Sequence, residues 1–354
     1  MWLLGRPVPC HYVPRQLPQL THVPYLLLDF VKEGQMLSKT WEELRHDQTR
    51  RANIFADISR VMLSISTQTF PRIGSLTIDS CGVIKLANRP LTWLVHELEN
   101  DQVPSDIPRV RTYAETDSYY SDLLNTHSNR IRDVANSINN VDDGELQLSV
   151  LTMMRALSRH YADPELRSGP FVLMLTDLHQ SNVFVDENWR ITALIDLEWA
   201  CVRPLEMLQP PYWLTSKSVD DLKGENLTEY DERRLEFMAA FEKEEAKSHS
   251  TLDISRSQTM KNCWETGNFW YFIAMDTFVG MCNLYKHHIR PKFLVLPRIS
   301  AGFERDTSLY WTPHADTFIT AKLEEREKYQ NRIRETFAQA AQEQAEKSGV
   351  QKEQ

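Results

Sequence analysis

Residues 171–200 read FVLMLTDLHQSNVFVDENWRITALIDLEWA, and this stretch decides both the expected fold and the expected site. The apolar run 171–176 has the length and composition of a strand, and it ends at Asp177. Asn182 follows five positions later. Two further apolar runs, 183–185 and 191–195, flank a polar turn and predict a hairpin that ends at Asp196. We therefore expect Asp177, Asn182 and Asp196 to converge on one cleft.

The residue types in this pattern are those that phosphoryl transfer requires. A carboxylate orients the hydroxyl nucleophile, and oxygen ligands hold the Mg²⁺ that bridges the phosphates. Asp177, Asn182 and Asp196 supply two carboxylates and one amide oxygen. An Asp and an Asn five positions apart occur often by chance, whereas the complete order of strand, Asp, Asn, hairpin and Asp is far more demanding.

The motifs LTDLHQSN (175–182) and IDLEW (195–199) resemble the catalytic loop and the metal-binding loop of the aminoglycoside phosphotransferase family, which has a protein-kinase-like fold. The segment VPYLLLDFVKEGQML (23–37) resembles that family's hinge strand and linker. The chain as a whole is similar to the large fungal branch of the family, and the resemblance extends from about Val23 to Trp270.

The resemblance implies a role for each matching residue. Asp177 would be the catalytic base, Asn182 and Asp196 would hold Mg²⁺, and the backbone at Asp29, Phe30 and Val31 would meet the adenine of ATP. His179 and Glu198 would be supporting groups: for His179 we favour a hydrogen bond that braces the loop, and for Glu198 a metal or substrate contact competes equally with a structural ion pair. The implied cofactors are ATP and Mg²⁺.

Two positions depart from the family pattern. Leu175 stands where the family usually has a histidine, and Leu197-Glu198 replaces the Phe-Gly that follows the metal-binding Asp of protein kinases. The missing histidine is a supporting group, so its loss is tolerable. Leu197-Glu198 also resembles the residues that the phosphotransferase branch has at these two positions.

The residues upstream of the hinge lack the phosphate-binding parts of a kinase-like amino-terminal lobe. No Lys precedes Lys32, no Glu precedes Glu33, and Gly5 is the only glycine there, although such a lobe needs a Gly-rich loop, a strand Lys and a helix Glu. Three explanations compete: a truncated chain, which we favour, a catalytically dead remnant, or substitution by Lys32 or Lys39. We expect weak or no activity from this chain, and the alternative function is a non-catalytic, pseudokinase-like binding scaffold.

Composition and charge set the broader expectations. The 354 residues carry 40 Lys and Arg against 49 Asp and Glu, a formal charge of −9, which disfavours nucleic-acid and anionic-membrane partners. The most apolar long segment, 269–285, contains Asp276 and Asn283, so a buried helix is favoured over a membrane span. Five dispersed cysteines without a CxxC motif indicate reduced thiols, and we predict a cytoplasmic protein.

The remaining segments predict an α+β protein, with a mostly helical carboxyl-terminal lobe, small β-hairpins and a truncated amino-terminal lobe. Residues 1–34 would be the remnant lobe and hinge, 35–317 the kinase-like lobe, and 318–354 a polar helix and tail. A hairpin is expected over 73–86, possessing a turn at Asp79–Gly82. Helical periodicity is seen in five segments, at 54–65, 113–124, 146–160, 230–247 and 260–287.

The substrate is expected to be a hydroxyl-bearing small molecule such as an aminoglycoside, a sugar or a choline-like compound. An amine-binding aromatic pocket is a minority interpretation, because aromatic residues at helical spacing usually belong to a core; its candidates are Trp199, Trp213, Trp264, Trp270 and Tyr271. Glu206, Asp220 and Asp221 lie where the resemblance places substrate-binding acids, although a solvated surface is the default expectation for them.

Overall fold

The computed structural model describes residues 30–248, 253–278, 280–294 and 302–350. Within them, helices predominate and the sheets are small and antiparallel, which confirms the predicted α+β class. The helices are α1 (Ser38–Leu44), α2 (Gln48–Ile65), α3 (Trp93–Asn100), α4 (Thr116–Asp133), α5 (Val141–Tyr161), α6 (Glu225–Glu245), α7 (Arg256–Thr266), α8 (Asn268–Met275), α9 (Met281–Leu284), α10 (Phe303–Ser308) and α11 (Ala315–Val350).

The strands form three sheets. One has the order β1-β6-β7, the second has the order β2-β5-β8, and β3 pairs with β4 alone. Their bounds are β1 (Gln35–Met36), β2 (Thr69–Phe70), β3 (Ser75–Ile78), β4 (Ile84–Asn88), β5 (Phe171–Leu175), β6 (Val183–Val185), β7 (Ile191–Leu194) and β8 (Ala200–Pro204). The predicted hairpins over 73–86 and 183–195 are therefore confirmed.

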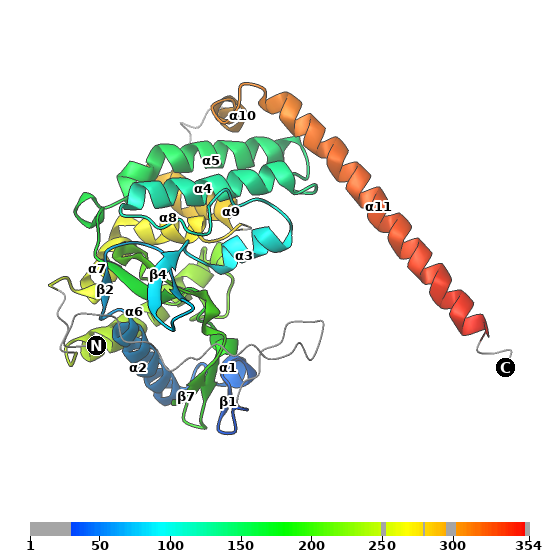
Figure 1. The fold of residues 1–354 in the computed structure, drawn as a ribbon. Helices are drawn as coiled ribbons and strands as arrows, with labels where there is room; N and C mark the ends of the chain where they lie inside the picture. Colours follow the sequence, from blue (N-terminus) through cyan, green and yellow to red (C-terminus); the bar gives the residue numbers. More distant parts are fainter. Residues whose placement is uncertain (1–29, 249–252, 279, 295–301, 351–354) are drawn as a thin grey trace.

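In helix α2, the apolar residues that recur at helical spacing pack in the core. Asp47 caps its amino terminus by accepting hydrogen bonds from the backbone N–H groups of Thr49 and Arg50. The apolar stripe turns inward, so that Ile54, Phe55 and Ile58 are fully buried. Helix α6 lies along this face, and its Phe237 meets Phe55 edge to face at 5.7 Å between ring centroids (Figure 1).

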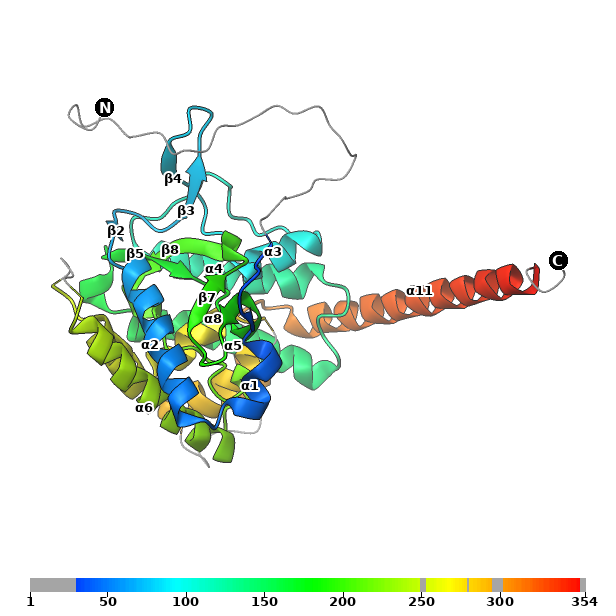
Figure 2. The ribbon, with the colours of Figure 1, turned by 90° about the horizontal axis from the view of Figure 1, so that it is seen from below.

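Helices α4, α5, α8 and α9 form a second layer. Helices α4 and α5 lie side by side and pack on α8 and α9 (Figure 1). Helix α11 begins in the core, where Ala315 and Ile319 are buried, and then extends away from the rest of the protein (Figures 1 and 2). Gly144 of α5 lets Ile319 approach, because a Cβ atom there would lie 2.9 Å from two of its side-chain atoms.

The continuous helix predicted over 260–287 is wrong. Helix α7 ends at Gly267, whose φ of +81° is left-handed, and α8 starts directly after it. A second break separates α8 from α9, which continues as a π-helical turn over Tyr285–Ile289. Hydrophobic periodicity persists across both breaks because all of these pieces pack on the same core.

The predicted hinge strand over 25–31 is not confirmed. Its residues 25–29 lie outside the described part of the chain, and Phe30 and Val31 belong to no strand. The first described strand is β1, which pairs with β6 through Gln35–Val185 and Met36–Phe184. No helix among the described residues is both long and apolar enough to cross a bilayer. The described cysteines, Cys81, Cys201, Cys263 and Cys282, are free thiols.

Candidate functional site

Strand β5 delivers Asp177 to the site. It is the middle strand of its sheet, held by β2 on one side and by β8 over its full length on the other. Phe171 and Val172 are fully buried, so the strand is anchored in the core at its start and reaches the surface at its end. Asp177 follows in a turn, with a side chain 27% exposed.

Asn182 is joined to Asp177 by hydrogen bonds across the intervening loop. A short 3-10 helix, Gln180–Asn182, folds the chain back, and the buried Asn182 amide nitrogen donates to the Asp177 carbonyl oxygen at 2.9 Å. The same nitrogen lies 3.4 Å from Oδ2 of the Asp177 carboxylate. With its nitrogen used in this way, the amide presents its oxygen atom as the group that can meet a cation.

The β6–β7 hairpin places Asp196 beside this pair. Val183 pairs with Leu194, and the Ile195 backbone N–H donates to the Asn182 carbonyl oxygen at 3.0 Å, which holds the two ends of the hairpin together. Asp196 follows in a left-handed conformation with φ 55° and ψ 51°. Such backbone is uncommon for a residue other than glycine and turns the Asp196 side chain out of the direction of the strand.

A small cavity of about 10 Å³ is lined by Asp177, Asn182 and Asp196 together. The structure thus brings the three residues singled out by the sequence to one place, although they come from a strand end, a 3-10 helix and a hairpin end.

His179 braces the loop between Asp177 and Asn182. Its Nδ1 accepts a hydrogen bond from the Ser181 backbone N–H at 3.2 Å, and its Nε2 lies 3.6 Å from Asp177 Oδ1. One ring nitrogen therefore contacts the start of the 3-10 helix, and the other lies near the carboxylate. These contacts are the ones expected of a bracing side chain.

Burial raises the pKa of the Asp177 carboxyl above its ordinary value. His179 and the Asn182 hydrogen bond counteract part of this shift, whereas the nearby carboxylates of Asp196 and Glu198 add to it. An excess of negative charge around a partly buried carboxyl favours the arrival of a cation or of a proton at this site.

Glu198 is exposed and lies in a short 3-10 helix, Leu197–Trp199, that follows Asp196. Trp199 of the same helix is buried, and its carbonyl oxygen accepts a 2.7 Å hydrogen bond from the Thr176 hydroxyl. This bond ties the residue before Asp177 to the segment that carries Asp196. Of the proposed adenine contacts, Phe30 is 84% exposed, Val31 is half-buried and Asp29 lies outside the described residues.

Two features of the site escaped the sequence analysis. Trp213 donates from its indole nitrogen to the Leu178 carbonyl oxygen at 2.7 Å, which fixes the loop from behind. Arg203 of β8 forms a two-pronged ion pair with Asp276, with N–O distances of 2.6 and 2.8 Å. The partners are 35 and 73 residues apart, so no local pattern in the sequence could have indicated either contact.

Several of the secondary candidate residues are buried. Trp213, Trp270 and Tyr271 are buried in the hydrophobic core, in agreement with the simpler interpretation of these aromatic residues. The default expectation of a solvated Glu206 is wrong. Its side chain is buried, and it accepts hydrogen bonds from the Tyr120 hydroxyl and from the Asp163 backbone N–H, which compensate for the loss of water.

Among the described residues, no group of three or more His, Cys, Asp or Glu side chains is arranged to hold a metal by itself. Mg²⁺ is usually held by one or two carboxylates together with phosphate oxygens and water. The donor set of Asp196, Asn182 and a phosphate-bearing ligand fits that pattern.

Comparison with known proteins points in the same direction. Residues 93–207, from the start of α3 to just beyond β8, match the model of the phosphotransferase enzyme family (APH). No curated protein and no solved structure matches the chain. The segment that carries Asp177, Asn182 and Asp196 is therefore similar to the phosphotransferase enzyme family.

Proposed function

We propose that this protein transfers the γ-phosphoryl group of ATP to a hydroxyl group of a small molecule, within a protein-kinase-like fold. The observation that carries the proposal is the shared cavity of Asp177, Asn182 and Asp196 in the segment that is similar to phosphotransferases. The carboxylates of Asp196 and Glu198 near Asp177 support it, because a cluster of negative charge attracts a cation.

Asp177 acts as the base in this proposal. The substrate hydroxyl oxygen attacks the γ-phosphorus, the bond from that phosphorus to the β–γ bridging oxygen breaks, and ADP leaves. The hydroxyl proton passes to the Asp177 carboxylate. Asn182 and His179 hold that carboxylate in place, so its orientation costs little at the moment of reaction.

Asn182 and Asp196 are the residues that would hold Mg²⁺, and the adenine would lie against the backbone at Asp29, Phe30 and Val31. When bound, the ion neutralises charge on the phosphates. The left-handed backbone at Asp196 supports this role, since strained conformations of this kind gather at functional sites.

The test is Mg²⁺-dependent transfer from ATP to a panel of small alcohols, followed by ³¹P NMR. We expect Asp177→Asn to lower the rate by about 10²–10⁴-fold, the usual contribution of a positioned base. The matched control is Asp186→Asn, because Asp186 accepts two backbone hydrogen bonds in the β6–β7 turn and Asn can do the same. The control should transfer at the rate of the unaltered protein.

A second measurement separates nucleotide binding from chemistry. Mg²⁺-ATP should raise the melting temperature of the unaltered protein, and Asp196→Asn should reduce that shift. If neither transfer nor a Mg²⁺-dependent shift occurs, or if Asp177→Asn leaves transfer unchanged, the proposed function is wrong.

A further inference from the structure

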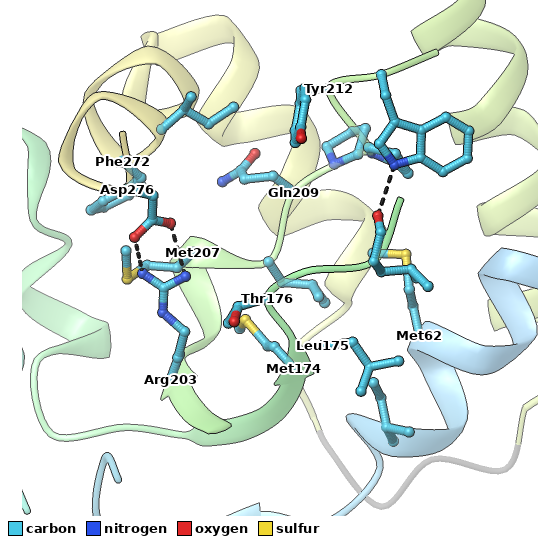
Figure 3. A pocket seen from close by; sticks show the side chains of 17 residues that line it. Met62, Met174, Leu175, Thr176, Arg203, Met207, Gln209, Tyr212, Phe272 and Asp276 are labelled. Atoms are coloured by element: carbon cyan, nitrogen blue, oxygen red, sulfur yellow. Dashed lines mark hydrogen bonds and ion pairs between the residues drawn. The ribbon is translucent and has the colours of Figure 1, made fainter. Parts of the chain in front are cut away.

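A second cavity, of about 140 Å³, lies next to the segment that carries Asp177, because Thr176 and Leu178 line it. Figure 3 shows the side chains around this cavity. It is bounded by α2, β5, the segment 207–213 and α8. Leu175, Thr176 and Leu178 line both this cavity and the small one beside Asp177, so the two spaces adjoin at the residues around Asp177.

The lining of the larger cavity is mostly apolar. Three methionines, Met62, Met174 and Met207, enter it from three different elements (Figure 3). Methionine side chains are flexible and polarisable, so they adapt to ligands of different outline. Phe272 and Ile273 of α8 also line the cavity. Such a surface favours an apolar group that leaves water, and it offers little to a strongly hydrated one.

The charges in the cavity cancel. Among the described residues that line it, only Arg203 and Asp276 carry a formal charge, and they bind each other through two hydrogen bonds (Figure 3). Arg203 also donates to the Tyr119 hydroxyl at 3.2 Å. A polycationic ligand would therefore find no free carboxylate here, because the Asp276 oxygens are already held by the guanidinium.

Size and position limit the ligand further. A volume of about 140 Å³ is close to that of the engineered apolar cavities that accept one benzene ring. Tyr212 lines the cavity and is 44% exposed, and Thr176 and Leu178, which flank Asp177 in the sequence, line it as well. A ring seated in the cavity can thus carry a hydroxyl toward the Asp177 loop.

We propose that this cavity binds the acceptor substrate through an uncharged, ring-sized apolar group, so that the substrate is a neutral aromatic or alicyclic alcohol and not an aminoglycoside. The identification of the ligand as the acceptor rests on the proposed function. The binding of such a group to this cavity does not, because it requires neither ATP nor turnover.

The test is binding of 4-fluorobenzyl alcohol, followed by ¹⁹F NMR line broadening in the absence of nucleotide. Ile273→Trp should fill the cavity from its rim and weaken binding at least tenfold. The matched control is Ile84→Trp on the exposed β4 strand, which does not line the cavity and should leave binding unchanged. If the Trp variant fails to fold, Ile273→Ala provides a second test, because its smaller side chain enlarges the cavity. This variant should bind a larger ring, that of 2-naphthylmethanol, in preference to the fluorinated probe.

Three outcomes overturn the proposal: no binding of the probe, equal weakening by both Trp variants, or displacement of the probe by equimolar kanamycin. Asp177→Asn distinguishes this proposal from the proposed function. Asp177 does not line the larger cavity, so this variant should still bind the probe while phosphoryl transfer is lost. Probe binding without any transfer in the unaltered protein would contradict the proposed function and leave the cavity assignment intact.

Discussion

The indole nitrogen of Trp213 donates a 2.7 Å hydrogen bond to the carbonyl oxygen of Leu178, the residue directly after Asp177. Trp213 itself is wedged edge-on against Trp41 of α1, with 5.3 Å between ring centroids. The loop that carries the proposed base is therefore held from behind by a buried aromatic side chain. Its position depends on packing far from the site in sequence.

Replacing Trp213 by Phe should loosen this loop. The Leu178 carbonyl oxygen would lose its partner, at a cost of about 1–3 kcal/mol in the free energy of unfolding. Phosphoryl transfer should fall as well, because Asp177 is no longer held. Trp311→Phe is the matched control: it removes an indole hydrogen bond to Ser128 of 3.1 Å, far from the site. It should leave transfer unchanged, and it should cost less stability in urea unfolding because Ser128 Oγ still accepts a hydrogen bond from Arg155 at 2.7 Å. Equal transfer by both variants would contradict the bracing role.

The Arg203–Asp276 pair predicts an asymmetric loss of stability. Arg203 is almost completely buried, so Asp276→Asn leaves its charge without a counter-ion and should cost about 3 kcal/mol in the free energy of unfolding. Asp316→Asn is the control, because the Arg305–Asp316 pair is exposed on both sides, and such pairs contribute about 0–1 kcal/mol. Urea unfolding of the two variants decides the point, and losses of equal size would be inconsistent with the buried pair.

Glu206 predicts a pH dependence of stability. Burial raises the pKa of its carboxyl from the ordinary 4.5 to about 7, although the hydrogen bonds from Tyr120 and Asp163 oppose the shift. The folded protein therefore binds this proton more tightly than the unfolded chain does. The contribution of Glu206 to stability is complete below pH 4.5 and is lost as the pH rises through about 7.

The difference should be on the order of 3 kcal/mol across that window. Glu206→Gln removes the titrating group, so its free energy of unfolding should change less between pH 5 and 8 than that of the unaltered protein. The exposed Glu165→Gln, 41 positions earlier, is the control and should follow the unaltered profile. Parallel profiles for the Glu206 variant and the unaltered protein would show that the residue does not titrate in this range.

Gly34 is required for the contact between β1 and the β6–β7 hairpin. Its φ is +84°, and a Cβ atom there would lie 2.5 Å from Thr192 Oγ1 and 2.7 Å from the Val185 carbonyl oxygen. Gly302 also has a positive φ, of +97°, but among the described residues other than its chain neighbours no atom lies within 4 Å of its Cβ position. Both Ala variants carry backbone strain of about 1–2 kcal/mol, and only Gly34→Ala adds the clash. A lower melting temperature for Gly34→Ala than for Gly302→Ala checks this, and equal values would contradict it.

Elements with a strong local signal were predictable. The apolar period of 3.6 residues over 54–65 correctly predicted a helix, which is part of α2. The turn residues Asp79–Gly82 correctly predicted the turn between β3 and β4. The helix predicted over 260–287 was wrong because hydrophobic periodicity reports burial and not continuity, and Gly267 was given too little weight as a terminator. Strand β8 was not predicted, because its pairing with β5 is a tertiary contact that no local sequence pattern indicates.

The sequence by itself determined the functional groups of the candidate site, which are two carboxylates and one carboxamide. Their spacing places them at the end of a strand, in a 3-10 turn and at the end of a hairpin, and all three line one cavity. These are local relationships within some 20 residues, and short-range backbone preferences encode them. Only the tertiary structure decided what surrounds them. The Trp213 brace, the Arg203–Asp276 pair and the apolar cavity unite residues from Met62 to Asp276, and burial at such distances depends on the packing of the whole core.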